Sequence, residues 1–173
     1  MRAFSWAQHQ PVGNGVSAIP VLLRMLIVED SEQWRRFISS IIEKDSQLRI
    51  TFEAVDGLEA VSKAEELKPD LILLDIGLPK LNGIEAARQI HALAPKSRIL
   101  FLSQESSAEV VQEALRFGLG FVAKIDAGKE LLSAVNAIMM DKRFLSSSLT
   151  PRIAPDKHAS ISFSSNYVAE DQS

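Results

Sequence analysis

The sequence contains no cysteine among its 173 residues. This excludes a disulfide framework, a thiolate zinc site and a cysteine nucleophile. Neither sign of charge dominates, because 19 lysine and arginine residues face 22 aspartate and glutamate residues. The net charge of −3 gives no long-range positive field toward nucleic acid or an acidic membrane surface. No hydrophobic run is long enough to span a membrane, and the first residues lack the apolar core of an export signal. We therefore expect a cytoplasmic protein.

What the sequence does contain is a regular alternation of two hydrophobic patterns. Short apolar runs alternate with amphipathic stretches, and three of the runs are apolar at consecutive positions, as in strands buried on both faces of a parallel sheet. The first amphipathic stretch places Trp34 and Phe37 on its apolar face, so both are predicted to be core residues. The pattern predicts an α/β fold, a doubly wound five-stranded parallel sheet with helices on both faces. The five predicted strands cover residues 21–28, 49–54, 71–74, 98–102 and 120–123.

Three segments follow from the same patterns. Residues 1–20 show no periodicity and are predicted to form a flexible N-terminal arm. Residues 21–145 form the predicted globular domain. Residues 146–173 contain eight serines and no amphipathic repeat, which indicates a flexible tail.

Polar side chains follow the predicted strands at the points where the strands end. Glu29 and Asp30 follow the first strand, Asp75 the third, Ser103 the fourth and Lys124 the fifth. Each residue alone is explained as a helix cap, a turn residue or a surface charge. The carboxyl ends of parallel strands share one edge of the sheet, however, so all five should meet there. Three clustered carboxylates repel one another unless a cation neutralises them, and an all-oxygen ligand set favours Mg²⁺. A carboxylate beside Mg²⁺, a hydroxyl and an ammonium suits phosphoryl transfer.

The motifs at these strand ends resemble those of the receiver domain of two-component response regulators. The resemblance covers about residues 22–145, and the LSQESS and RFLSSSLT stretches resemble the NarL/FixJ-like subclass. It implies a (βα)5 flavodoxin-like fold with strand order 2-1-3-4-5. The motifs are LIVED at 26–30, LILLDIGLP at 71–79, NG at 82–83, LS at 102–103 and GLGFVAK at 118–124.

The resemblance implies a role for each residue at the acidic end of the predicted site. Asp75 matches the phosphoacceptor, and Asp30 and Asp75 match the direct Mg²⁺ ligands. The backbone carbonyl of Gly77 matches the third protein ligand, and Glu29 matches the acid that holds the metal through water.

The resemblance also implies how the phosphoryl group would be sensed. Ser103 matches the hydroxyl residue that hydrogen-bonds the phosphoryl group, and Lys124 matches the lysine that pairs with it. Phe121 stands at the switch aromatic position, where the ring turns inward when the hydroxyl residue moves. The family commonly has tyrosine there, so only burial of the ring is left to mark the active state. Gln104 stands where a smaller residue is usual, and its bulk is expected to narrow access to Asp75.

The implied function is a phosphorylation switch rather than an enzyme acting on other molecules. A sensor histidine kinase or histidine phosphotransfer protein would donate a phosphoryl group to Asp75. The face of the fourth helix, fifth strand and fifth helix would then bind a downstream protein partner, with a homodimer as a further candidate.

Two alternatives stay open at this point. One is a truncated DNA-binding transcriptional regulator, because subclass relatives continue into a helix-turn-helix whereas only 28 residues follow Leu145. Without such an output domain, nucleic-acid binding is not expected. The other is a receiver-like scaffold that works without phosphorylation, although the complete acidic, hydroxyl and lysine set argues against it. A phosphoester hydrolase is disfavoured because Gly77 stands where its acid would be needed.

Overall fold

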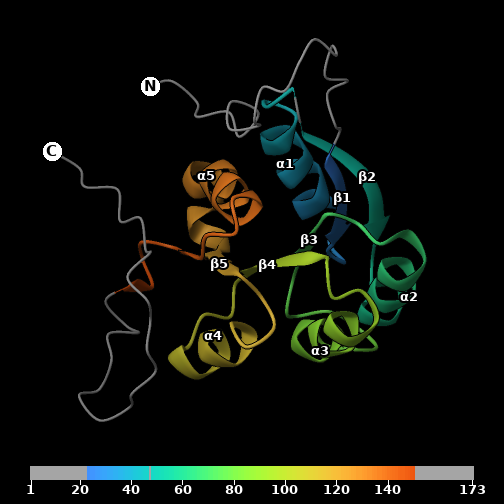
Figure 1. The fold of residues 1–173 in the computed structure, drawn as a ribbon. Helices are drawn as coiled ribbons and strands as arrows, with labels where there is room; N and C mark the ends of the chain where they lie inside the picture. The colour runs from blue at the N-terminus through green and yellow to red at the C-terminus, as the bar shows by residue number, and fades with distance from the viewer. Residues whose placement is uncertain (1–22, 47, 151–173) are drawn as a thin grey trace, which may run out of the picture.

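The computed structural model describes residues 23–46 and 48–150, which form a parallel sheet covered by helices on both faces (Figure 1). The sheet order is β2-β1-β3-β4-β5-β6, and every neighbouring pair is parallel. Its strands are β1 (Leu23–Val28), β2 (Leu48–Ala54), β3 (Leu71–Leu74), β4 (Arg98–Ser103), β5 (Gly120–Ala123) and β6 (Phe144–Leu145). The helices are α1 (Glu32–Ile42), α2 (Gly57–Leu67), α3 (Gly83–Leu93), α4 (Ala108–Ala114), the short 3-10 turn η2 (Lys124–Asp126) and α5 (Ala127–Met139).

The central strands are apolar at consecutive positions because each of their faces meets a separate hydrophobic core. Alternate residues of β1 and β3 point to opposite sides: Leu26 and Ile72 join one core, and Ile27 and Leu73 join the other. Helices α2, α3 and α4 cover the first core, while α1 and α5 cover the second (Figure 1). Strand β2 lies at the sheet edge and alternates between buried and exposed positions. This arrangement confirms the predicted doubly wound α/β fold and the strand order 2-1-3-4-5.

The sheet contains one strand more than the five predicted. Strand β6 pairs with β5 in parallel, and residues 146–150 beyond it are described as well. Ser146 and Leu149 are buried, and both lie past residue 145, where the flexible tail was predicted to begin. The arm at 1–20 and the tail from 151 onward lie outside the described residues.

Side-chain burial corrects one prediction about α1. Ile38, Ile41 and Ile42 are buried, and Trp34 packs partly buried against the same core. Phe37 is 39% exposed, so its predicted place in the core is wrong. It lies at the margin of the apolar stripe, with its ring edge-on to Trp34 at 5.3 Å between centroids. In the part of the chain that the structure describes, no helix has the length and apolar character to cross a membrane.

Candidate functional site

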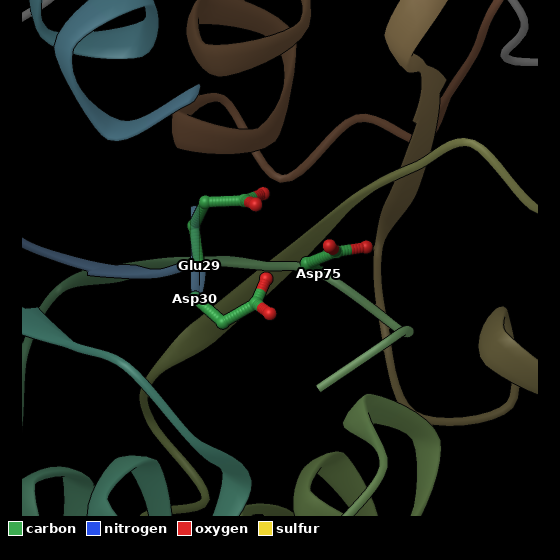
Figure 2. A group of neighbouring side chains, drawn as sticks. All are labelled: Glu29, Asp30 and Asp75. Atoms are coloured by element: carbon green, nitrogen blue, oxygen red, sulfur yellow. The ribbon is translucent and has the colours of Figure 1, made fainter. Parts of the chain in front are cut away.

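Three carboxylates meet where β1 and β3 end. Glu29 and Asp30 follow β1, Asp75 follows β3, and one oxygen from each lies within 4.8 Å of the others (Figure 2). Glu29 and Asp75 are buried, while Asp30 is exposed. The parallel pairing of β1 with β3 produces this meeting, because Val28 and Leu74 are register partners and the acids come directly after them.

Backbone amides hold the Asp75 side chain in place. Its Oδ1 accepts hydrogen bonds from the N–H groups of Ile76 at 2.7 Å and Gly77 at 3.3 Å. The Asp75 amide itself donates to the carbonyl of Val28 at 3.0 Å. Gly77 is exposed in the loop between β3 and α3, directly beside the carboxylate. The carboxylate is therefore oriented before any ligand binds.

Lys124 joins two of the three carboxylates. Its Nζ donates a hydrogen bond to Asp75 Oδ2 at 2.9 Å and forms an ion pair with Glu29 Oε2 at 2.7 Å. The lysine is only 7% exposed, and it reaches the acids from the end of β5. The contact with Glu29 has the distance of an ion pair but lacks hydrogen-bond alignment, which leaves the buried Oε2 without a directed donor.

Burial and charge shift the pKa values of this pair. Burial raises the pKa of Glu29 and outweighs the opposing contact with the Lys124 ammonium, while the negative charge of Asp75 raises it further. For Lys124, burial lowers the pKa, but the two carboxylates more than compensate. The net pKa of Lys124 is raised, so the ammonium stays charged at neutral pH.

The donor set fits a divalent cation. Three carboxylates and one ammonium leave two negative charges uncompensated when all are ionised. All of the donor atoms are oxygens, the ligands that Mg²⁺ prefers, and Mg²⁺ retains several waters that can reach acids too distant to bind directly. The buried Glu29 Oε2 without a directed donor is a suitable partner for such a water. The residues present therefore fit Mg²⁺.

Ser103 reaches the same end of the sheet from β4. The register pairs Leu74 with Phe101 and Ser103 with Ala123, which places Ser103 beside the start of η2. Ser103 is buried, and its Oγ accepts a hydrogen bond from the N–H of Glu105 at 3.1 Å. The hydroxyl is thus engaged within its own loop.

Phe121 is already inside the protein. Its side chain is fully buried and stacks with Phe101 at a centroid distance of 6.3 Å. The sequence predicts that this ring moves inward when the chain is phosphorylated, and that movement stays a prediction.

Two residues that sequence reasoning did not single out as functional also contact the site. Arg35 Nη1 donates to the carbonyl oxygens of Glu29 at 2.7 Å and Asp30 at 3.1 Å, and its Nε donates to Glu53 at 3.1 Å. The ring of Trp34 lies under Lys124, with Nζ 4.8 Å from the ring centroid. The only sequence signal for either contact is the position of both residues in the first turns of the helix that follows the acidic pair.

The loop after Asp75 packs tightly against its surroundings. A Cβ atom on Gly83 would lie 1.9 Å from the carbonyl oxygen of Asp75, so only glycine fits at this position. Lys80 in the same loop pairs with Asp56, whose Oδ1 also accepts a hydrogen bond from Glu59 N–H at 2.8 Å and caps α2. These contacts fix the loop that carries Gly77.

Comparisons with known proteins agree with this geometry. The family model for the response regulator receiver domain matches residues 25–136. The chain is 36% identical over 115 residues to the chemotaxis protein CheY of Listeria monocytogenes, covering 66% of this chain and 96% of that protein. It is 35% identical over 172 residues to a protein-glutamate methylesterase/protein-glutamine glutaminase of Colwellia psychrerythraea, covering 86% of this chain and 45% of that protein.

Solved structures show the same relationship. The response regulator domain of Thermotoga maritima CheB matches with a TM-score of 0.57 and 34% identity, covering 78% of this chain and 98% of that one. A LuxR-family two-component response regulator from Aurantimonas sp. SI85-9A1 matches with a TM-score of 0.72 and 29% identity, covering 75% and 94%. The chain spans less than half the length of the Colwellia methylesterase. The NarL/FixJ-like subclass stays a prediction, whereas the family is shown: the chain belongs to the response regulator receiver domains of two-component systems.

Proposed function

We propose that Asp75 accepts a phosphoryl group from a phosphohistidine of a sensor histidine kinase or a histidine phosphotransfer protein. A carboxylate oxygen of Asp75 attacks phosphorus, the P–N bond breaks, and the imidazole nitrogen leaves with the bonding electron pair. The observation that carries this proposal is the position of Lys124 Nζ, 2.9 Å from Asp75 Oδ2 and 2.7 Å from Glu29 Oε2. The ammonium is thus in place to meet the negative charge on the transferred group.

The acidic residues would contribute to Mg²⁺ binding in two ways, directly and through water. In our proposal Asp30, Asp75 and the Gly77 carbonyl bind the ion directly, and Glu29 holds it through water. When bound, the ion would neutralise charge between the attacking carboxylate and the phosphoryl oxygens. Asp75 is kept oriented for attack by the backbone N–H groups that bond its Oδ1.

The conformational response to phosphorylation would begin at the same end of the sheet. Ser103 would leave its bond with Glu105 N–H and donate to the new phosphoryl oxygens, which carry a charge of about −1.5 to −2 in a phosphorylated protein. We propose that this movement alters the face formed by α4, β5 and α5, with Phe121 packed behind it. A downstream protein partner or a second copy of the chain would bind that altered face. One related structure is a CheX–CheY complex from Borrelia burgdorferi containing BeF3 and Mg, which shows a receiver bound to a protein partner.

Neither alternative function is favoured by the relatives. The CheY relative is matched over 96% of its length and so consists of little besides the matched region. The scaffold alternative would not require the Lys124 contacts with two acids. We propose a cytoplasmic signalling domain that assists only its own phosphorylation and dephosphorylation.

A phosphodonor assay tests the proposal. Incubation with Mg²⁺ and phosphoramidate should add one phosphoryl mass to the intact protein, and Asp75→Asn should remove that addition. Asp70→Asn is the matched control, because Asp70 directly precedes β3, at the end opposite to Asp75, and pairs with Arg24. An unmodified wild-type protein would refute the proposed function.

A further inference from the structure

The Lys124 ammonium has a neutral neighbour besides its two acids. Its Nζ lies 4.8 Å from the centroid of the Trp34 ring, over the indole face. This is within the distance at which a cation is attracted by the negative face of an aromatic ring, and indole is the strongest aromatic partner for a cation. The ammonium is therefore flanked by Asp75, Glu29 and Trp34.

Without the Trp34 ring, the Lys124 side chain would have space to move its ammonium away from Asp75. A hollow of about 300 Å³ is lined in part by Lys124, Trp34 and the 89% exposed Ile125. Lysine has a flexible four-carbon stem, so an ammonium that is no longer held at Asp75 can extend through this hollow toward solvent. The hollow is lined by Trp34, Gln104, Ser106, Ala123, Lys124 and Ile125.

The indole attracts the ammonium in circumstances where the carboxylates hold it less strongly. A divalent cation held by Asp30 and Asp75, and by Glu29 through water, would repel the ammonium, whereas a neutral ring attracts it whether or not the acids are neutralised. The backbone of Trp34 is fixed by the helix N-cap, since its N–H donates to Ser31 Oγ at 3.4 Å, and its side chain packs on the core with its ring edge-on to Phe37.

We propose that Trp34 is a positioning residue for phosphoryl transfer, which keeps the Lys124 ammonium at Asp75. This inference rests on the proposed function of Asp75 as phosphoacceptor. Replacing the ring by an aliphatic side chain should slow phosphorylation by about 3- to 10-fold, the size expected for loss of one cation–ring contact. A variant that keeps an aromatic face should restore most of the rate.

The variants are Trp34→Leu, Trp34→Phe and, as the control for loss of an aromatic ring elsewhere, Phe52→Leu. Phe52 lies in β2 and packs partly buried against the core on the opposite face of the sheet from Trp34. Lysine labelled with ¹³C gives a direct signature in the metal-free protein, because the indole ring current shifts the ε-CH₂ protons of Lys124 upfield. Lys124→Met identifies that signal by its disappearance.

We expect the shifted Lys124 signal in the wild type and in Phe52→Leu, a smaller shift in Trp34→Phe, and none in Trp34→Leu. Phosphorylation rates with phosphoramidate should follow the same order. An unchanged Lys124 signal in Trp34→Leu, or phosphorylation of that variant at the wild-type rate, overturns the role of Trp34 but leaves the proposed function of Asp75 standing. Absence of phosphorylation in every protein, including the wild type, overturns the proposed function instead. Trp34→Met replaces Trp34→Leu if circular dichroism shows that the leucine variant does not fold.

Discussion

Removal of the buried hydroxyl of Ser146 should measure how much the residue after β6 contributes to the stability of the domain. Ser146 is fully buried, and its Oγ accepts a hydrogen bond from the N–H of Ala123 at 2.9 Å. Strand β6 ends one residue earlier, so the hydroxyl takes the place of a strand carbonyl for this amide. Ser146→Ala leaves the Ala123 amide buried without a partner, which costs about 1–3 kcal/mol.

Urea unfolding followed by circular dichroism is the appropriate assay. With an m value of about 1–3 kcal/mol/M, the loss should lower the unfolding midpoint by about 1 M and leave m unchanged. Ser147→Ala is the control, since Ser147 is exposed and hydrogen-bonds to Glu130 at the surface. It should change the free energy of unfolding by no more than about 0.5 kcal/mol. If both variants unfold alike, the segment after β6 does not contribute to the fold as described.

Three further perturbations test the loops around the site. Gly83→Ala forces a Cβ to within 1.9 Å of the carbonyl oxygen of Asp75, so it should lower the free energy of unfolding by about 1–3 kcal/mol and slow phosphorylation, while Gly128→Ala in α5 should not destabilise the protein. Hydrogen bonding by Lys80 lowers the pKa of Asp56 below its ordinary 3.8, so this pair stabilises the fold above that pH and the contribution is lost as pH falls through the lowered pKa. Lys80→Met should therefore raise the pKa of Asp56 in an NMR titration and destabilise the protein at pH 7 but not at pH 2, whereas equal destabilisation at both would contradict the reasoning. Arg35→Met removes two hydrogen bonds to the carbonyls after β1 and should weaken Mg²⁺ binding about 10-fold by calorimetry; unchanged affinity would show that Arg35 does not position the acidic pair.

The layers of the fold were predictable because each hydrophobic pattern has few ways to be buried. Apolar runs such as 71–74 need cover on both faces, and amphipathic stretches supply it. Strand β6 was missed because two residues show no period, and the serines after it resemble a flexible segment. Ser146 and Leu149 are held by contacts with β5 and its core that no local pattern reveals.

The sequence allowed a prediction of which residues meet at the site. The carboxyl ends of parallel strands lie at one edge of the sheet, whatever conformations their side chains adopt. Glu29, Asp30 and Asp75 followed from that rule and do meet. Side-chain contacts between different elements did not follow. The place of Trp34 over Lys124 depends on how α1 lies beside η2, and helical spacing could only assign the tryptophan to an apolar face.

Asp75 is the residue that we propose to be phosphorylated among the three clustered carboxylates. The most direct test is to phosphorylate the protein with phosphoramidate and Mg²⁺, trap the acyl phosphate by borohydride reduction, and map the reduced residue by peptide mass spectrometry. We expect the reduced residue at Asp75, and no reduction when Mg²⁺ is chelated beforehand. Reduction at Glu29, Asp30 or any other carboxylate, with Asp75 intact, would contradict the account.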